Sequence, residues 1–533
     1  AQSPRSLPGA YSGAAPVNYV RTWEVVKPIT DPNSLTLSTG LQTARITTQY
    51  FDGLGRPVQQ VMKQGSLVTD SAAVDMVSMT TYDAFGREAH RYLPAPANST
   101  GGNTHINDGL FKLNPFQQQE AFYNTYLNGQ AGEVSSGKNW AYSQTSFEAS
   151  PLNRPLEQFA PGVSWVGTEG QGSEAGRKSV KTKYWINTAN DGVRIWDVTV
   201  GATGSFSSYA SPGAYPAGEL YKNVMVDEHG KQVIEFKDKE GKVVLKKVQL
   251  TATADDGAGK DHSGWLCTYY LYDDLGNLRC VVQPRGVELI AGNWVLTNAT
   301  ILAEQCFRYE YDERNRMVVK KVPGAGEVYM VYDARDRLVM TQDAQLRALS
   351  PQQWLVTLYD NLNRPVQTGL LKNSYPIGGT ANRTFAQHRA AATPNPPTSF
   401  TGYPFATTAT PNSTYWELLS QTGYDSYSSV PGGLSGTYDN SWNGQLSPTD
   451  NTIYPYPQLP VQSTAVKGMV TWTQVKVLGS SPAAYLTTVS IYDDRGRVIQ
   501  TKSSNSTGGV DIGTTQYSWA GMPLVTVYKQ EKA

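Results

Sequence analysis

The sequence predicts an all-β fold in which repeated β-hairpins form a large curved or spiralling antiparallel sheet, a partial shell, with one or two short helices. Three observations predict it. A motif of apolar run, tight turn and second apolar run recurs along the 533 residues. Its turns carry Asp followed by Gly, or by Asn or Asp where Gly is absent. Gly (49), Pro (31) and Tyr (32) are abundant, as expected for many turns between half-buried strands.

The clearest copy of the motif is SIYDDRGRVIQ, which begins at Ser490. Tyr492 ends an incoming strand, and the carboxylate of Asp493 can accept hydrogen bonds from backbone N–H groups of the turn. Gly496 stands where φ is expected to be positive, and Arg497 begins the returning strand. The pattern predicts a hairpin with a four-residue loop, a type I turn closed by a glycine bulge.

The other copies share an aromatic residue, Asp, two variable residues, Gly or its substitute, and usually Arg. Asn and Asp are the other residues that tolerate the left-handed region, so the substitutions support one common backbone shape. We expect the following residues to build these turns: Asp52, Gly55, Arg56, Tyr82, Asp83, Gly86, Arg87, Tyr272, Asp273, Gly276, Tyr311, Asp312, Arg316, Tyr332, Asp333, Arg337, Tyr359, Asp360, Arg364, Tyr492, Asp493, Gly496 and Arg497. Looser copies begin at Phe147-Glu148, Val226-Asp227 and Phe236-Lys237-Asp238.

These motifs resemble the YD repeats of RHS-type proteins, from about Asn18 to Tyr528. The stretches that begin at Tyr50, Glu235 and Lys320 are similar to the Bacteroidota branch of that family, whose N-terminal domain has no assigned function. The resemblance implies a large β-cocoon. It implies little about activity, because the family's activity usually resides in C-terminal segments that vary between members.

The order of the motifs suggests five segments. Residues 1–17 form an extended lead-in, and residues 18–145 an N-terminal domain with two repeat hairpins and a helix that starts at Asn114-Pro115. Residues 146–372 form a repeat sheet, residues 373–460 an irregular insertion rich in Pro, Ser, Thr and Gly, and residues 461–533 a continuation that we expect to be truncated. We also expect a short helix at 299–305 and a hairpin at 180–200 that turns at Asp191-Gly192.

Charge and termini limit the partners. Lys and Arg together equal Asp and Glu, 45 each, which argues against a nucleic-acid partner. The sequence contains no apolar run long enough for a membrane span. The chain begins Ala1-Gln2 rather than with Met, so we expect a secreted or cell-surface protein whose signal peptide has been removed, unless a boundary of another kind falls here.

The sequence offers little catalytic chemistry. We expect no catalytic residues, no metal and no cofactor, since no zinc, calcium-loop, nucleophile-elbow or phosphate-loop spacing occurs. Most acidic residues have structural tasks in turns, so a glycoside hydrolase is a distant alternative. The three cysteines, Cys267, Cys280 and Cys306, form no disulfide framework. Buried free thiols are favoured over a disulfide between Cys267 and Cys280.

Two hypotheses about function follow. The first is a non-catalytic shell segment that encapsulates or presents a C-terminal effector of the same longer chain, of the polymorphic-toxin kind. The alternative is a cell-surface adhesin or glycan-binding module that uses the segments 94–140 and 373–460, with tryptophans such as Trp185 and Trp196 as stacking surfaces.

Overall fold

The computed structural model describes residues 6–13, 17–66, 73–126, 141–162, 178–202, 204–250, 258–393, 402–405, 410–448 and 454–532. Within them, 26 strands belong to one large sheet and two to a small one, and every strand pair in the described residues is antiparallel. The prediction of an all-β fold built from hairpins is therefore confirmed. The described part of the chain contains five short α-helices, more than the one or two predicted.

The chain divides into two compact units, which are described separately. Unit 1 comprises residues 1–193, 215–267 and 453–455, and unit 2 comprises residues 194–214, 268–452 and 456–533.

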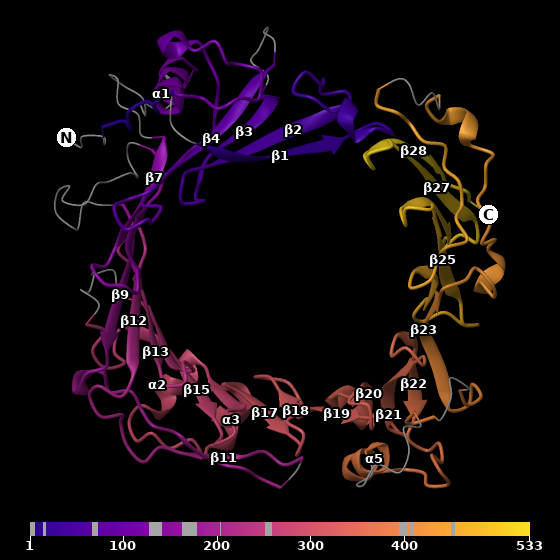
Figure 1. Ribbon diagram of the computed structural model, residues 1–533. Helices are drawn as coiled ribbons and strands as arrows, with labels where there is room; N and C mark the ends of the chain where they lie inside the picture. Colours follow the sequence, from indigo (N-terminus) through magenta and orange to yellow (C-terminus); the bar gives the residue numbers. More distant parts are fainter. Residues whose placement is uncertain are drawn as a thin grey trace. The chain divides into compact units, whose positions relative to one another are not determined.

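In unit 1 consecutive strands pair in the order β1, β2, β3, β4, β5, β7, β8, β9, β12, β13 and β14, and β6 pairs with β4. Figure 1 shows β1 to β4 side by side with α1 beside them. The bounds are β1 Asn18–Val25, β2 Ala44–Phe51, β3 Pro57–Ser66, β4 Val74–Thr81, β5 His90–Tyr92, β6 Ala95–Pro96, α1 Pro115–Tyr126, β7 Tyr142–Phe147, β8 Pro155–Phe159, β9 Val180–Ile186, β12 Tyr221–Val226, β13 Gln232–Lys237 and β14 Val243–Gln249.

In unit 2 strands pair in sequence order from β15, whose first residues lie in unit 1, to β28, and β10 Asp197–Thr199 pairs with β11 Ser208–Ala210. Helix α5 lies beside β19 to β21 (Figure 1). The bounds are β15 Trp265–Tyr272, β16 Leu278–Val282, α2 Pro284–Ile290, α3 Ala299–Glu304, β17 Cys306–Tyr311, β18 Met317–Lys321, β19 Val328–Tyr332, β20 Leu338–Gln342, α4 Ala344–Ala348, β21 Gln353–Tyr359, β22 Pro365–Lys372, α5 Phe385–Ala392, β23 Trp416–Tyr424, β24 Val470–Lys476, β25 Tyr485–Tyr492, β26 Val498–Ser504, β27 Val510–Tyr517 and β28 Pro523–Lys529.

Residues alternate along each strand between two faces, because successive side chains of a strand point to opposite sides. We call one the covered face, since helices and extended segments lie over it, and the other the open face. On β25, Val489 and Ile491 are fully buried on the covered face, whereas Thr488 and Ser490 are half-buried on the open face. Apolar clusters on the covered face form the cores of both units.

Glutamine side chains hold several covering segments to the sheet. Gln59 donates to the carbonyl of Lys112 at 3.0 Å and accepts from its N–H at 2.7 Å. In unit 2, Gln500 makes the same pair of bonds with the backbone of Asp439. Gln516 makes them with the backbone of Ser447, at 2.9 and 3.1 Å. We call this arrangement a glutamine clamp; it satisfies buried backbone groups that no strand pairs.

The predicted helices at 115 and 299 are confirmed, and local signals explain the others. Proline occupies the first turn of α2, and Asp343 caps α4. Thr384 and Gln387 form a capping box at the start of α5, with bonds of 2.8 and 3.3 Å.

The predicted hairpin at 180–200 is wrong. Strand β9 pairs with β8 and β12, and residues 189–191 form a 3₁₀ turn. The reason is the Asp191 carboxylate, which is buried and accepts from Lys222 Nζ at 2.6 Å and from the Thr188 N–H at 2.6 Å. A buried charge needs such partners, and they hold Asp191 over the sheet instead of in a hairpin turn.

The three cysteines are buried thiols without disulfide bonds, as the sequence favoured. Among the described residues, no helix has both the length and the apolar character needed to cross a membrane.

Candidate functional site

The repeated turns, which we call corners, share one hydrogen-bond pattern. At Asp333, the backbone N–H donates to the carbonyl of Arg337 at 3.0 Å, and the carboxylate Oδ1 accepts from the N–H groups of Arg335 and Arg337. Asp336 adopts a φ of 60°, and the register shifts by one residue between Val331 and Tyr332. Each corner is thus a tight loop closed by a bulge, which the Asp carboxylate caps from inside.

The structure places the other expected corner residues in equivalent positions. Leading carboxylates accept from the backbone four residues on at Asp52, Asp83, Asp273, Asp312, Asp360 and Asp493. The left-handed position is held by Gly55, Gly86, Gly276, Asn315, Asn363 and Gly496, with φ between 55 and 79°.

Each corner is also joined to the next incoming strand. Arg337 donates from Nε to Asp333 Oδ2 at 2.8 Å, and its guanidinium lies 4.9 Å from the ring centre of Tyr359. The Tyr359 hydroxyl donates to the carbonyl of Leu338 at 2.8 Å. We call this set of contacts, Asp to Arg to Tyr to backbone, a latch. It couples each hairpin to the following one through a charge-assisted bond and a cation–π contact.

Latches recur within both units. The Arg–aromatic distances are 4.3 to 5.1 Å for Arg56–Tyr82, Arg87–Phe147, Arg154–Tyr184, Arg279–Tyr311, Arg316–Tyr332, Arg364–Tyr424 and Arg497–Tyr517. Among the described residues, hydroxyls that close the latch on the preceding strand belong to Tyr82, Tyr184, Tyr311, Tyr359, Tyr424, Tyr492 and Tyr517.

One latch arginine was missed in the sequence. The corner that begins Tyr272-Asp273 has Asn277 where the other corners have Arg. Arg279, two residues later, donates to Asp273 Oδ2 at 2.7 Å and to Glu310 at 2.6 Å, and it stacks on Tyr311. Arg279 replaces the missing Arg at position 277. An arginine within two residues of the expected position was therefore the sequence signal for this latch.

A second missed corner is split by an insertion. The Asp425 N–H donates to the carbonyl of Met469, and Gly468, with a φ of 82°, donates to Asp425 Oδ1 at 2.6 Å. The register shift between Gly423 and Tyr424 matches that of the closed corners. The chain therefore leaves this corner after Asp425 and returns at Gly468; we call the intervening segment, 426–467, the strap.

A further corner begins at Ser518; the sequence predicted a turn at Gly521, but not that it belongs to the repeat series. Its N–H donates to the carbonyl of Met522, its hydroxyl accepts from the Met522 N–H at 2.9 Å, and Gly521 has a φ of 92°. A hydroxyl here replaces the Asp carboxylate and Met replaces Arg. The aromatic-x-x-x-Gly spacing of Tyr517 to Gly521 was the available signal.

Two of the looser copies form the turn without the full latch, whereas the one at Glu148 has it. Asp227 and Asp238 accept from backbone N–H groups in the usual way, but Lys follows in place of Arg. Glu148 substitutes for Asp and pairs with Arg154 at 2.7 Å. Because Lys lacks a planar guanidinium, it cannot reproduce both the fork to the carboxylate and the stacking.

The corner carboxylates are stabilised in their charged form. The hydrogen bond from the Arg154 side chain lowers the pKa of Glu148 to about 2. Arg364 and the Gly468 N–H lower the pKa of Asp425 to about 2. Burial alone raises the pKa of Asp312, but hydrogen bonds from the Arg316 side chain and backbone bring it below its ordinary value.

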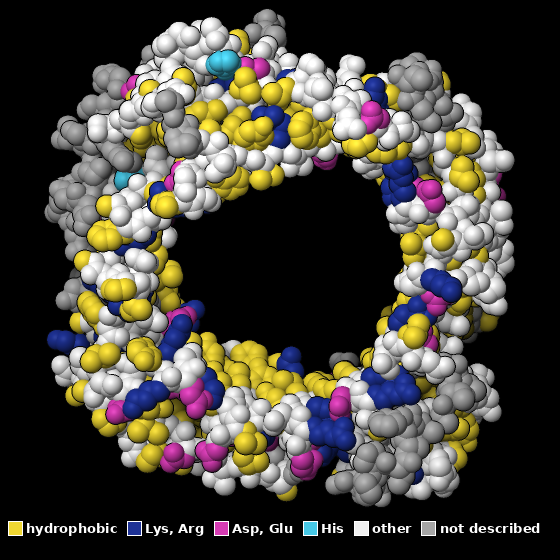
Figure 2. Space-filling view, in the orientation of Figure 1, with side chains coloured by type: hydrophobic (Ala, Val, Ile, Leu, Met, Phe, Trp, Pro, Cys, Tyr) yellow, Lys and Arg dark blue, Asp and Glu magenta, His cyan; other side chains and the backbone are white. Residues whose placement is uncertain are grey.

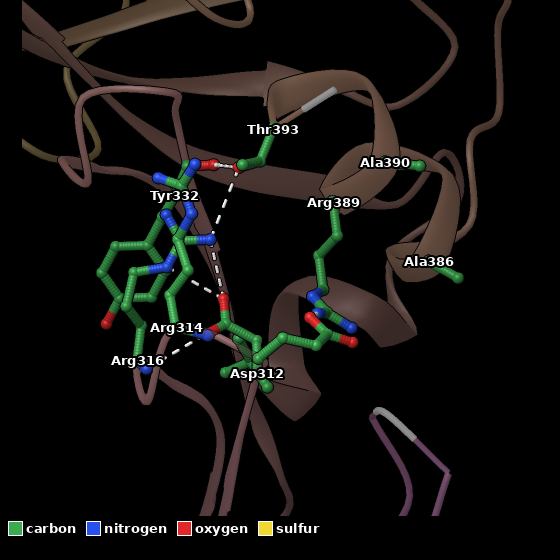
Figure 3. Close-up of a pocket in the computed structure, with 10 residues that line it drawn as sticks. Asp312, Arg314, Arg316, Tyr332, Ala386, Arg389, Ala390 and Thr393 are labelled. Atoms are coloured by element: carbon green, nitrogen blue, oxygen red, sulfur yellow. Dashed lines mark hydrogen bonds and ion pairs between the residues drawn. The ribbon is translucent and has the colours of Figure 1, made fainter. Parts of the chain in front are cut away.

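A pocket of about 520 Å³ lies between one corner and α5 (Figure 3). Asp312 and Arg316 form one wall, and Arg389 and Ala390 of α5 the other. The Thr393 hydroxyl donates to the carbonyl of Tyr332 at 2.8 Å and closes one end. The guanidinium of Arg389 lies 3.9 Å from the Glu313 carboxylate, so the charges lining this pocket are largely paired with one another.

Buried ion pairs in unit 1 fix covering segments rather than forming a reaction centre. Lys112 and Asp75 are fully buried and pair at 2.7 Å, and Asp75 also accepts from the N–H groups of Gln64 and Gly109. Lys247 donates to the carbonyls of Asp191, Gly259 and Asp261, and burial lowers its pKa to about 8. Within the described ranges, no cluster of three or more His, Cys, Asp or Glu side chains could hold a metal ion.

Comparisons with known proteins give one family match and several structural likenesses. Residues 21–179 match the model of a family described as a domain of unknown function (DUF6443). The comparison with curated proteins gives no match. Solved structures that resemble this chain include a crystal structure of TcdB2-TccC3-TEV, with 12% identity over 97% of this chain and 19% of that chain at a TM-score of 0.45.

Two further structures are similar at the same level. A crystal structure of TcdB2-TccC3 without its hypervariable C-terminal region has 14% identity over 91% of this chain and 18% of that chain, with a TM-score of 0.43. A Photorhabdus luminescens Tc holotoxin pore has 12% identity over 98% of this chain and 19% of that chain, with a TM-score of 0.42. The chain spans about a fifth of the length of the proteins it resembles.

Proposed function

We propose that this chain is a non-catalytic wall segment of a secreted RHS/YD-repeat protein, which encapsulates or presents a C-terminal effector of the same longer chain. The observation that carries the proposal is the latch. It joins one hairpin to the next by the same kind of contacts at many places along the chain, so a sheet can be extended strand by strand with a similar local geometry. A sheet of this many strands twists and has to curl, and a curled sheet can surround a polypeptide.

The nature of the repeated contacts also supports a structural role. Asp, Arg and Tyr are residue types that often perform catalysis. In the latch, however, their polar groups are already bonded to the backbone and to one another. Asp333, for example, accepts two backbone N–H groups and two guanidinium contacts and is 1% exposed. A carboxylate in that state is not available as a general base.

Limited proteolysis of the natural gene product tests the proposal. If the wall encloses the segment encoded after residue 533, that segment should resist protease while the latches are intact. Substituting three latch arginines, Arg316, Arg337 and Arg364, by Gln should open the wall and expose it. Equal digestion of the downstream segment in the parent and the variant, or a gene product with no downstream segment, would refute enclosure.

One observation favours glycan binding as the second candidate. A pocket of about 640 Å³ in unit 1 is lined by Trp185 and Tyr221, with Asn190, Asn223 and Lys260 around them. Trp185 is 41% exposed and Tyr221 is 56% exposed, so their rings can stack on a sugar while the amides bond its hydroxyls. A glycan array in which Trp185→Ala loses any hits that the parent shows would support this role; an array without hits would exclude it.

A further inference from the structure

The open face of unit 2 carries rows of hydroxyl side chains. Thr422, Thr473, Thr488 and Ser503 are direct cross-strand neighbours on β23, β24, β25 and β26. Parallel to this row, Ser490 faces Thr501. Other hydroxyls of this face, on β21 to β28, are those of Thr357, Thr368, Ser420, Thr515 and Thr526.

These hydroxyls are accessible but partly satisfied. Apart from Thr526, which is exposed, all are half-buried by their neighbours. Some pair across strands: Thr368 with Ser420 at 2.6 Å, and Thr488 with Ser503 at 3.1 Å. Neighbouring strands lie roughly 4.8 Å apart, so each row presents closely spaced hydroxyls with bonding capacity left for water.

On β24 and β25, large apolar groups of this face stand toward the strand ends remote from the corners. Val475, which is 54% exposed, faces Leu486, which is 38% exposed. Lys476 pairs there with Glu417. Near the corners, the latch tyrosines such as Tyr492 are tied to the backbone of the preceding strand. On β23 to β26 the middle of the face is therefore uncharged and short-chained. Elsewhere in unit 2 the open face also carries apolar side chains: Leu355 faces Leu370, and Met330 faces Thr341.

The open face of unit 1 has the opposite character between β9 and β14. Met225 faces Val233, and Val233 faces Val248. Tyr221 faces Ile186. Met225 is 55% exposed, Ile186 is 58% exposed and Val248 is 36% exposed. The same sheet architecture thus tolerates large apolar residues on this face, so the hydroxyl rows of unit 2 are not required for folding.

We propose that the hydroxyl rows of unit 2 form a non-adhesive wall against which a non-native polypeptide is held without binding. This inference rests on the proposed function, since it describes the surface that an enclosed effector would meet. An unfolded chain sticks to a surface through apolar contact and through unpaired charge. The hydroxyl rows offer neither, and a contacting chain would have to displace water that already has good hydrogen bonds.

The distribution of charge is consistent with this property. On the face shown in Figure 2, Lys and Arg side chains stand beside Asp and Glu side chains at several places, and no broad area of one sign appears. The corner arginines are neutralised by their own aspartates, as at Arg497 and Asp493 at 2.7 Å. Paired charges give a weak field at a distance, so they attract a polypeptide of either sign only weakly.

Binding of a labelled, permanently unfolded polypeptide tests the proposal. Reduced and alkylated α-lactalbumin serves as the probe, with fluorescence anisotropy as the readout. The triple variant T473V/T488V/T501V replaces hydroxyls by methyls of equal size, and T473S/T488S/T501S keeps the hydroxyls. Both sets are made in a M225T/V248T background, which removes the two exposed members of the Met225–Val233–Val248 row of unit 1.

We expect the valine variant to bind the probe at least about tenfold more tightly than the serine variant, and the serine variant to match the parent. Equal binding by the valine and serine variants, or tighter binding by the serine variant, would overturn the proposal. Because β-branched valine suits strands, the valine variant should fold; circular dichroism checks this, and T488V alone replaces it if it does not.

The outcome is independent of the test of enclosure. Protease protection of a downstream segment reports whether anything is surrounded, whereas probe binding reports only how this face treats an unfolded chain. If the valine variant binds the probe more tightly but the downstream segment is not protected from protease, the non-adhesive property of the surface is supported and the enclosing role is refuted. If the downstream segment is protected but the valine and serine variants bind the probe equally, the enclosing role is supported and this inference is refuted.

Discussion

Two corners of the same sheet show what the latch requires. At Asp333 the corner is closed, and two residues separate the Asp from the residue with positive φ. At Asp425 the corresponding partner, Gly468, follows only after the whole strap. Both corners nevertheless give the same one-residue register shift. In both, a tyrosine hydroxyl of the next incoming strand donates to a carbonyl just after the corner: Tyr359 to Leu338, and Tyr492 to Val470.

The difference shows that the corner is defined by its bonds and not by a continuous loop. At the split corner, Asp425 has no following Arg; Arg364 of the preceding corner supplies a bidentate pair at 3.0 and 2.6 Å. Loop length changes the closure entropy only slowly, so a long excursion between bonded ends is tolerated. An insertion can therefore enter at a corner without disturbing the strands.

Removing the strap should produce the largest effect. Replacing 426–467 by two residues would restore a closed corner, but Leu434, Tyr427 and Val430 would no longer cover the core around Val489 and Ile491. We expect β23 and β24 to stay paired while β25 and β26 lose roughly 3–6 kcal/mol of local stability. Hydrogen exchange measures both; free exchange of β23 amides with β26 still protected would contradict the comparison.

Asp333→Ala should have the next largest effect. The substitution leaves the half-buried guanidinium of Arg337 without its carboxylate and two N–H groups without an acceptor, a loss of about 3–5 kcal/mol at β19 and β20. Asp425→Ala, at a more exposed carboxylate, should lower protection of β23 and β24 by clearly less. Local hydrogen exchange of both variants checks the order, and a greater loss in Asp425→Ala would reverse it.

Alanine at a left-handed glycine compares another closed corner, that of Asp52 with Gly55, with the split corner and its Gly468. A Cβ added at Gly55 or at Gly468 meets nothing within 4 Å, and their φ values are 76 and 82°. Each alanine should therefore report backbone strain alone, about 1–2 kcal/mol, and asparagine should cost less. Unequal losses for Gly55→Ala and Gly468→Ala would show that the two corners differ in backbone geometry.

Acid should weaken the split corner without affecting it near neutrality. The pKa of Asp425 is lowered to about 2 from an ordinary 3.8. The folded state therefore binds fewer protons than the unfolded state, and the stabilisation is complete above about pH 4 and is lost as the pH falls through 2. Thermal unfolding of the parent between pH 4 and 2 should show this loss, and Asp425→Asn should show less of it.

The strands and the closed corners could be predicted from the sequence because, in a closed corner, the residues that make the turn's hydrogen bonds lie within six consecutive positions. Asp493, Gly496 and Arg497 are recognisable wherever they occur, since each supplies one bond of the turn. The corner at Asp425 could not be found this way, because its glycine is far along the chain. Arg279 was missed because it stands two residues beyond the usual position of the Arg and reaches Asp273 from there.

Features on the covered face could not be predicted from the sequence, for a different reason. A lone Gln59 or Gln516 has no periodicity or spacing that marks it as a clamp, and its partner is a backbone group of any residue type. Asp191-Gly192 predicted a hairpin turn, because Asp-Gly is a strong turn signal, but its carboxylate is buried. Only the position of Lys222 on β12 shows that this Asp serves an ion pair.

The glutamine clamps affect how such a chain can diverge. The side-chain amide of Gln500 binds the peptide group of Asp439, not its carboxylate. A covering segment held in this manner can exchange most of its residues during evolution and remain seated, provided that the glutamine persists beneath it. Relatives should accordingly keep the glutamines while the segments above them vary freely in composition.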